Sequence, residues 1–189
     1  MHRQGHETEY VGTMVFGATT PCYDLEQQID CHYESSHITM EQVTAQSKLF
    51  IGTIEQTPPL FSAVKIDGQR AYEYARKEEQ EVSAKSKMVR IDVFDVSNYR
   101  ISDASIDNPV NIETAHGAKV SDGSKKDLYQ APQGRVPDGL PLVDFSVRCG
   151  KGTYIRSLAR DMGTALNSGA FLSALRRTRV GDYDITQAY

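Results

Sequence analysis

The stretch CGKGTYIRSLARDMG, residues 149–163, predicts a strand that passes through a glycine-flanked lysine into a helix. Before it, apolar residues alternate with polar ones, which is typical of a half-buried strand: Val143, Phe145 and Val147. After it, apolar residues at helical spacing form one stripe that should face a core: Ile155, Leu158, Ala159, Met162 and Leu166. Arg156 and Arg160 are four residues apart and fall on another face. We therefore expect Tyr154 and Arg156 where a strand end meets a helix start.

The turn Gly150-Lys151-Gly152 leaves two interpretations open. It could cradle a phosphate, because unpaired N–H groups and the positive end of a helix dipole favour an anion there. It could equally be an ordinary strand-to-helix turn. A Walker A loop is excluded, since Phe145 and Gly152 stand where that motif requires Gly and Ser or Thr.

The composition is that of a soluble globular protein, with 189 residues, 39% hydrophobic and 24% charged. No apolar run approaches the roughly 20 residues that cross a bilayer, and the first residues lack the apolar core of a signal peptide. We therefore expect a cytoplasmic protein with no membrane partner. Cys22, Cys31 and Cys149 show no Cys-x-x-Cys spacing, which predicts free thiols and no metal site.

The net charge of −4 argues against a uniformly basic surface, but the basic residues gather late in the chain. The last quarter holds Arg148, Lys151, Arg156, Arg160, Arg176, Arg177 and Arg179. We expect a positive face on an acidic protein.

The remaining segments predict one α+β domain, a mixed α/β arrangement of strands and helices without a dinucleotide-binding glycine motif. We predict strands at residues 10–16 and 89–99, and a helix capped by Thr39 with Gln42 that runs toward Gly52. Asp67-Gly68 predicts a hairpin-like reversal, followed by a short helix over about residues 70–77. The end of the chain predicts a short element from Gly169 and then a strand over residues 176–185.

Residues 102–141 lack a periodic pattern and are rich in Asp, Asn, Ser, Gly and Pro. This stretch joins two predicted strands and far exceeds the usual connection of a few residues. We interpret it as a surface insertion, either disordered or a partner-binding arm, and favour disorder.

Four separated motifs together resemble the TruB family of tRNA pseudouridine synthases, and the resemblance spans most of the chain. The motifs are Tyr10 with Gly17, Thr20 and Asp24; residues 58–65 with Gly68 and residues 70–76; residues 150–156; and residues 175–178. The resemblance implies a pseudouridine synthase-like mixed sheet flanked by helices. It also implies a cofactor-free, metal-free isomerase that acts as a monomer on the T-arm of tRNA and converts the T-loop uridine 55 to pseudouridine.

The same resemblance assigns roles to individual residues. Tyr10 is similar to the aromatic residue that stacks on the flipped-out uracil, and flipped bases gain from an aromatic face. Tyr154 resembles the tyrosine placed as a general base, and Arg156 the partner of the catalytic aspartate, which its rigid fork can hold. Contacts with RNA are expected from Lys65, Lys151, Arg176 and Arg177.

The family's nucleophilic aspartate belongs to a Gly-x-Leu-Asp-Pro motif, and this sequence contains no Asp-Pro pair. We therefore expect an N-terminally incomplete catalytic domain over residues 1–189 that is inactive by itself. A non-catalytic tRNA-binding or tRNA-folding protein on the same scaffold is the alternative. A phosphate-binding protein built on residues 150–153 is a third and weaker hypothesis.

Overall fold

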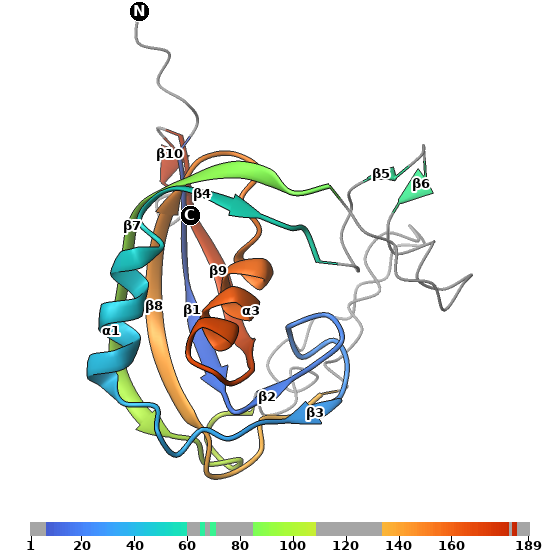
Figure 1. Ribbon diagram of the computed structural model, residues 1–189, viewed down its shortest axis with the longest axis vertical. Coiled ribbons are helices and arrows are strands. Elements are labelled where there is room, and N and C mark those ends of the chain that lie inside the picture. The colour runs from blue at the N-terminus through green and yellow to red at the C-terminus, as the bar shows by residue number, and fades with distance from the viewer. Residues whose placement is uncertain are drawn as a thin grey trace, which may run out of the picture.

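The protein forms a six-stranded antiparallel sheet with two helices against one face, in a computed structural model that describes residues 7–59, 65–66, 69–70, 85–108, 134–181 and 183–184 (Figure 1). The predicted α+β class is confirmed.

The strands in sheet order are β10 (Tyr183–Asp184), β9 (Ala170–Val180), β1 (Thr8–Phe16), β8 (Pro141–Cys149), β7 (Lys87–Ile101) and β4 (Gly52–Gln56). The helices are α1 (Met40–Leu49) and α3 (Ile155–Ala165). Two small antiparallel pairs complete the described elements: β2 (Ala18–Thr19) with β3 (Cys31–His32), and β5 (Lys65–Ile66) with β6 (Gln69–Arg70).

Two apolar clusters lie on opposite faces of the sheet, because alternate residues of each strand point to opposite sides. In β1, Met14 and Phe16 join the cluster beneath α1 and α3, whereas Val15 joins the cluster on the other face. The whole predicted stripe of α3, from Ile155 to Leu166, is buried in the first cluster. The stripe therefore determines which side of α3 packs against the sheet and which side faces away from it.

Several local predictions are confirmed. Thr39 is the N-cap of α1, where its hydroxyl accepts the backbone N–H of Gln42 at 3.3 Å. The predicted reversal agrees with the antiparallel pairing of β5 with β6, in which Ile66 lies opposite Gln69. The helix predicted over residues 70–77 lies outside the described residues, apart from Arg70, which belongs to β6.

The predicted division near Gly169 is wrong, since residues 170–180 form one continuous strand, β9, beside β1. The pairing of β9 with β1 shifts register between Glu9 and Tyr10 and again between Thr13 and Met14. Such shifts place an extra residue in one strand and interrupt the alternation of apolar and polar side chains. The interrupted pattern therefore resembles two elements in the sequence.

The long connection between β7 and β8 is anchored at both ends. The Ser102 N–H donates to the Leu140 carbonyl at 2.7 Å, and the Asn108 carboxamide bonds both backbone groups of Val136 at 3.0 and 2.6 Å. Val136 is only 1% exposed and belongs to the second apolar cluster. Residues 102–108 and 134–140 are thus integral to the fold, and the insertion hypothesis now concerns residues 109–133, which lie outside the described part. No helix in the described part is long and apolar enough to cross a membrane.

Candidate active site

The turn before α3 is held by its own hydrogen bonds. The Thr153 hydroxyl donates to the Gly150 carbonyl at 2.8 Å, and the Gly150 N–H donates to the Arg90 carbonyl at 2.8 Å. Gly152 has a φ of +85°, in the left-handed region that favours glycine. Because the Gly150 N–H is already occupied, the turn has lost one of the donors that a phosphate cradle would use. The hydrogen bonds favour the ordinary turn of the two interpretations.

Tyr154 is the N-cap residue of α3 and has an extended backbone, with no side-chain cap of its own. The buried carboxamide of Gln56, at the end of β4, bonds the backbone of Tyr154. Gln56 Oε1 accepts the Tyr154 N–H at 2.8 Å, and Gln56 Nε2 donates to the Tyr154 carbonyl at 3.0 Å. The ring of Tyr154 lies with its centroid 4.9 Å from the ammonium group of Lys87, within the range of a cation–π contact. The backbone of Tyr154 is thus fixed from two sides, while its half-buried ring remains partly accessible.

Arg156 lies in the first turn of α3 and forms an ion pair with Asp24, in the loop after β2. Arg156 Nη1 lies 3.7 Å from Asp24 Oδ2 and 3.5 Å from the carbonyl of Cys22. The side chains of Arg156 and Asp24 are only 22% and 23% exposed. Tyr23, between Cys22 and Asp24, has a φ of +60°, which is uncommon outside glycine and turns the loop sharply. This loop therefore brings a carboxylate to the arginine that the sequence singled out.

Arg160 confirms that the two arginines share a face. Its guanidinium carbon lies 5.9 Å from the centroid of the Tyr23 ring, so both arginines flank the same loop. Arg160 also donates to the Thr57 carbonyl at 2.9 Å and pairs with Asp161 at 3.0 Å. The face opposite the apolar stripe of α3 is therefore polar and cationic.

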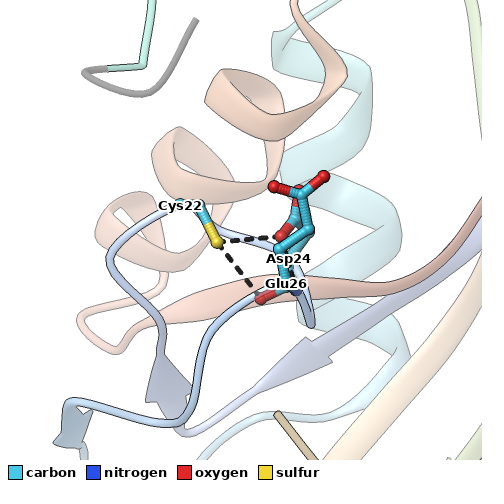
Figure 2. A group of neighbouring side chains, drawn as sticks. All are labelled: Cys22, Asp24 and Glu26. Atoms are coloured by element: carbon cyan, nitrogen blue, oxygen red, sulfur yellow. Dashed lines mark hydrogen bonds between the residues drawn. The ribbon is translucent and has the colours of Figure 1, made fainter. Parts of the chain in front are cut away.

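Cys22, Asp24 and Glu26 bring potential metal-ligand atoms within 4.8 Å of one another (Figure 2). The Cys22 thiol donates to Asp24 Oδ1 at 2.8 Å. Burial, together with this hydrogen bond to Asp24, raises the pKa of Cys22. A neutral thiol is a poor metal ligand, and the guanidinium of Arg156 already supplies positive charge to Asp24. The group fits a thiol, carboxylate and guanidinium network better than a metal centre.

Tyr10 lies on the face of the sheet that carries α3. It stands opposite Val147 of β8 and Arg177 of β9, and packs against the first apolar cluster. Burial raises the pKa of Tyr10, a nearby Cys149 adds to this, and the charge and hydrogen bond of Arg177 oppose it. Because β8 continues from Cys149 into the turn before α3, Tyr10 lies at the end of the sheet where that helix begins.

The predicted RNA contacts fall into two groups. Lys151, Arg176 and Arg177 are exposed, the first in the turn before α3 and the others on β9. The backbone of Lys65 lies in β5, and its side chain is outside the described part. The RNA contacts of Lys65, Lys151, Arg176 and Arg177 stay predictions.

Sequence reasoning missed Asp24 as a partner of Arg156, and missed Gln56 and Lys87 altogether. Gln56 could have been found, since Gly52, Ile54 and Gln56 share one face of β4, and an amide on the same face as the partly buried Ile54 needs a partner. Asp24 was visible as part of a motif, but nothing local points to its partner 132 residues later in the numbering.

Two models of known protein families match this chain. The sequence model of the TruB family pseudouridylate synthase N-terminal domain matches residues 2–119. The model of the tRNA pseudouridylate synthase B C-terminal domain matches residues 156–189. Both matched segments contribute strands to the same six-stranded sheet, β1, β4 and β7 from the first and β9 and β10 from the second.

Individual proteins are also similar. The tRNA pseudouridine synthase B of Bacteroides fragilis is 42% identical over 184 residues, covering 97% of this chain and 62% of that protein. The tRNA pseudouridine synthase B of Bacteroides thetaiotaomicron is 44% identical over 179 residues, covering 95% and 60%. This chain thus spans about 60% of the length of these relatives. A chain in the crystal structure of a Cbf5–Nop10–Gar1 complex has a TM-score of 0.48 and 21% identity, covering 95% of this chain and 32% of that one.

Proposed function

Because this chain belongs to the TruB family of pseudouridylate synthases, we propose that it provides the base-binding and proton-transfer part of an enzyme that isomerises uridine 55 in the T-loop of tRNA to pseudouridine. The nucleophilic aspartate is supplied by the Gly-x-Leu-Asp-Pro segment of the family. The observation that carries the proposal is that Tyr154 and Arg156 project from the first turn of one helix, whose start is held by Gln56 and whose arginine is paired with Asp24.

Tyr154 acts as the proton-transfer group. An enzyme that breaks and remakes the bond between base and sugar must extrude the base and then remove a proton from the carbon that becomes bonded. The aspartate attacks the nucleotide, the base detaches and rotates, and Tyr154 takes part in the proton transfer. A fixed backbone and a partly accessible ring suit a group that must hold one geometry against a mobile base.

Arg156 orients carboxylates, and Tyr10 contributes the aromatic face on which the extruded uracil stacks. Support for Arg156 comes from its partly buried pairing with Asp24, since a planar guanidinium can hold a second carboxylate in a fixed orientation. Support for Tyr10 comes from its half-buried position at the end of the sheet where α3 begins.

The T-arm of tRNA is the partner, and its phosphates meet the exposed basic groups around this end of the sheet. Lys151, Arg176 and Arg177 can each neutralise phosphate charge, and Lys65 joins them from the motif that includes β5. No cofactor or metal has a part in the proposed reaction.

The experiment measures pseudouridine formation in a T-loop RNA hairpin, comparing this chain with the same chain preceded by the family's aspartate segment. We expect turnover only from the extended protein, because without a covalent nucleophile the remaining groups cannot form the intermediate. Tyr154→Phe in the extended protein keeps the ring and removes the hydroxyl, and should lower turnover by about 10²–10⁴-fold.

Tyr99→Phe is the matched control, since Tyr99 donates its hydroxyl to the Ile38 carbonyl at 2.8 Å, away from the start of α3. It should leave turnover close to that of the parent protein. Turnover by the unextended chain would refute the need for the aspartate segment. RNA binding without turnover by the extended protein would instead favour a non-catalytic tRNA-binding or tRNA-folding protein.

A further inference from the structure

Gln56 is a buried amide whose polar atoms serve one residue. It is 1% exposed at the end of β4, the edge strand beside β7. Burying an amide without hydrogen bonds destabilises the folded state. Gln56 avoids this cost by bonding both backbone groups of Tyr154, with its oxygen at 2.8 Å from the N–H and its nitrogen at 3.0 Å from the carbonyl. The pairing thus resembles one rung of a strand ladder, made by a side chain.

The bond to the Tyr154 N–H lies at a helix end that lacks a cap. The first N–H groups of a helix have no acceptor within the helix. The side chain of Tyr154, the N-cap residue, makes no hydrogen bond to any of them. Thr57, the residue after Gln56, extends the same clamp, because its carbonyl accepts from Ser157 Oγ at 2.8 Å and from Arg160 Nη2 at 2.9 Å. Two consecutive residues therefore bond the N-cap residue Tyr154 and two residues of α3, Ser157 and Arg160. Arg156 lies between Tyr154 and Ser157 in the sequence.

We propose that Gln56 is a positioning residue, which fixes the backbone of Tyr154 so that its phenol meets the target base in one geometry and the nearby Arg156 keeps its orientation toward carboxylates. This rests on the proposed function of Tyr154. The requirement is specific to a glutamine, since an ionised glutamate cannot donate to the carbonyl and an asparagine is one methylene shorter. A hydrophobic side chain of the same length fills the space and makes neither bond.

The first test uses this chain and measures amide hydrogen exchange in Gln56→Met. We expect the Tyr154 amide to exchange at least about tenfold faster, after correction for the change in the amides of β8, because its buried acceptor is gone. Gln56→Glu retains an oxygen for that N–H and should recover most of the protection. Gln42→Met is the matched control, since Gln42 is exposed on α1 and should leave the Tyr154 amide unchanged.

The second test measures turnover in the protein extended with the aspartate segment. Gln56→Met should lower kcat at least about tenfold while KM changes less than about threefold. The kcat of Gln56→Glu should lie between that of Gln56→Met and that of the parent protein. If Gln56→Met does not fold, Gln56→Glu assayed at a pH where its carboxyl is ionised still removes the bond to the carbonyl and should lower kcat with KM unchanged.

The outcomes separate the two proposals. An extended parent protein without turnover refutes the proposed function, and exchange at Tyr154 then decides alone whether Gln56 fixes this residue. Unchanged exchange at Tyr154 in both Gln56 variants overturns the positioning role. Faster exchange with an unchanged kcat also overturns it, because Gln56 would then be only a structural contact.

Discussion

Arg156 is held in a way that distinguishes orientation from RNA binding. Its Nη1 lies within 3.7 Å of the Asp24 carboxylate and 3.5 Å of the Cys22 carbonyl. A guanidinium engaged by protein acceptors is restricted in direction, because its donors are arranged in a rigid plane. A lysine at the same place would keep the charge and lose that geometry.

We therefore predict that Arg156→Lys in the extended protein lowers turnover at saturating RNA at least tenfold, with a much smaller change in tRNA affinity. A poorly paired carboxylate in a partly buried site costs about 1–3 kcal/mol, which is enough for this effect. Steady-state kinetics on a T-loop RNA would measure it. Arg148→Lys is the control, since Arg148 is 43% exposed and pairs with Glu9 at 3.2 Å. A parallel loss of RNA affinity, with a flatter salt dependence, would instead make Arg156 a phosphate contact.

At the level of single residues, the places of Tyr154 and Arg156 in the fold were predictable from the sequence, but the residues that they contact were not. The alternation before residue 149 and the helical stripe after it placed Tyr154 and Arg156 at the start of α3. Arg156 contacts Asp24 and Cys22 in the loop after β2, and the backbone of Tyr154 bonds the Gln56 carboxamide of β4. Such contacts depend on how distant segments pack, which no local period encodes.

At the level of elements, Asp144 on β8 links three adjacent strands. Its carboxylate accepts from Thr13 of β1 at 2.9 Å, and from Asn98 and Arg100 of β7 at 2.8 and 3.3 Å. Burial opposes ionisation, but the hydrogen bonds from Asn98 and Thr13 and the charge of Arg100 outweigh it, so the pKa of Asp144 is lowered. The ionised form therefore strengthens the centre of the sheet.

The pH dependence follows from this direction. A carboxyl group with a lower pKa in the folded state contributes stability above its unfolded pKa, about 3.9, and loses it as the pH falls through the folded value. We predict that Asp144→Asn lowers the free energy of unfolding by about 1 kcal/mol or less at pH 7, because the side chain is 39% exposed and solvent weakens the pairing.

Urea denaturation of both proteins between pH 7 and pH 2.5 would measure this difference. It should shrink as the pH falls below about 4. Asp95→Asn, on the same face of the sheet in β7, is the control. A difference that stays constant down to pH 2.5 would show that the Asp144 charge contributes nothing.

The elements themselves were largely predictable where their period is regular. The Thr39 cap, the alternation of β8 and the stripe of α3 each agree with the structure. β9 was divided in two because register shifts against β1 disturb its alternation. Irregular pairing arises between strands, so the sequence of one strand alone does not reveal it.

At the level of the whole molecule, the fold class and the bounds of the long connection between β7 and β8 followed from the order of periodic segments, whereas the burial within that connection did not. Val136 is an isolated apolar residue in a polar stretch, and its burial depends on the cluster formed by Val15, Leu142 and Phe171. Asn108 closes the connection onto Val136 by two hydrogen bonds, and its carboxamide nitrogen also donates to the Ala104 carbonyl, so both its polar atoms are bonded. The two anchored ends therefore lie close together.

We predict that replacing residues 109–133 with a short Gly-Ser linker changes the free energy of unfolding by less than about 1 kcal/mol. The reason is that closure entropy varies only slowly with loop length. tRNA affinity should change less than about threefold, because the replaced stretch holds as many acidic as basic residues. Urea denaturation and RNA titration would test both values.

Removing residues 102–140 instead should destabilise the protein by about 2–4 kcal/mol, since Val136 and its neighbours would leave the core. This larger deletion is the control for the smaller one. A large loss of RNA binding in the 109–133 replacement, with stability preserved, would identify that stretch as an arm that contacts RNA.

The central position of β1 has a consequence for synthesis on the ribosome. β1 (Thr8–Phe16) is translated well before its neighbours in the sheet, β8 (Pro141–Cys149) and β9 (Ala170–Val180). Thr13 of β1 and its partner Asp144 are 131 residues apart, which at about 5–20 residues per second means a wait of roughly 7–26 s. Throughout that interval the nascent β1 has neither of its native partners, and its apolar residues are open to chaperones and to other nascent chains. Translation speed and chaperone supply should therefore affect the yield of this protein more than that of a protein whose neighbouring strands are consecutive.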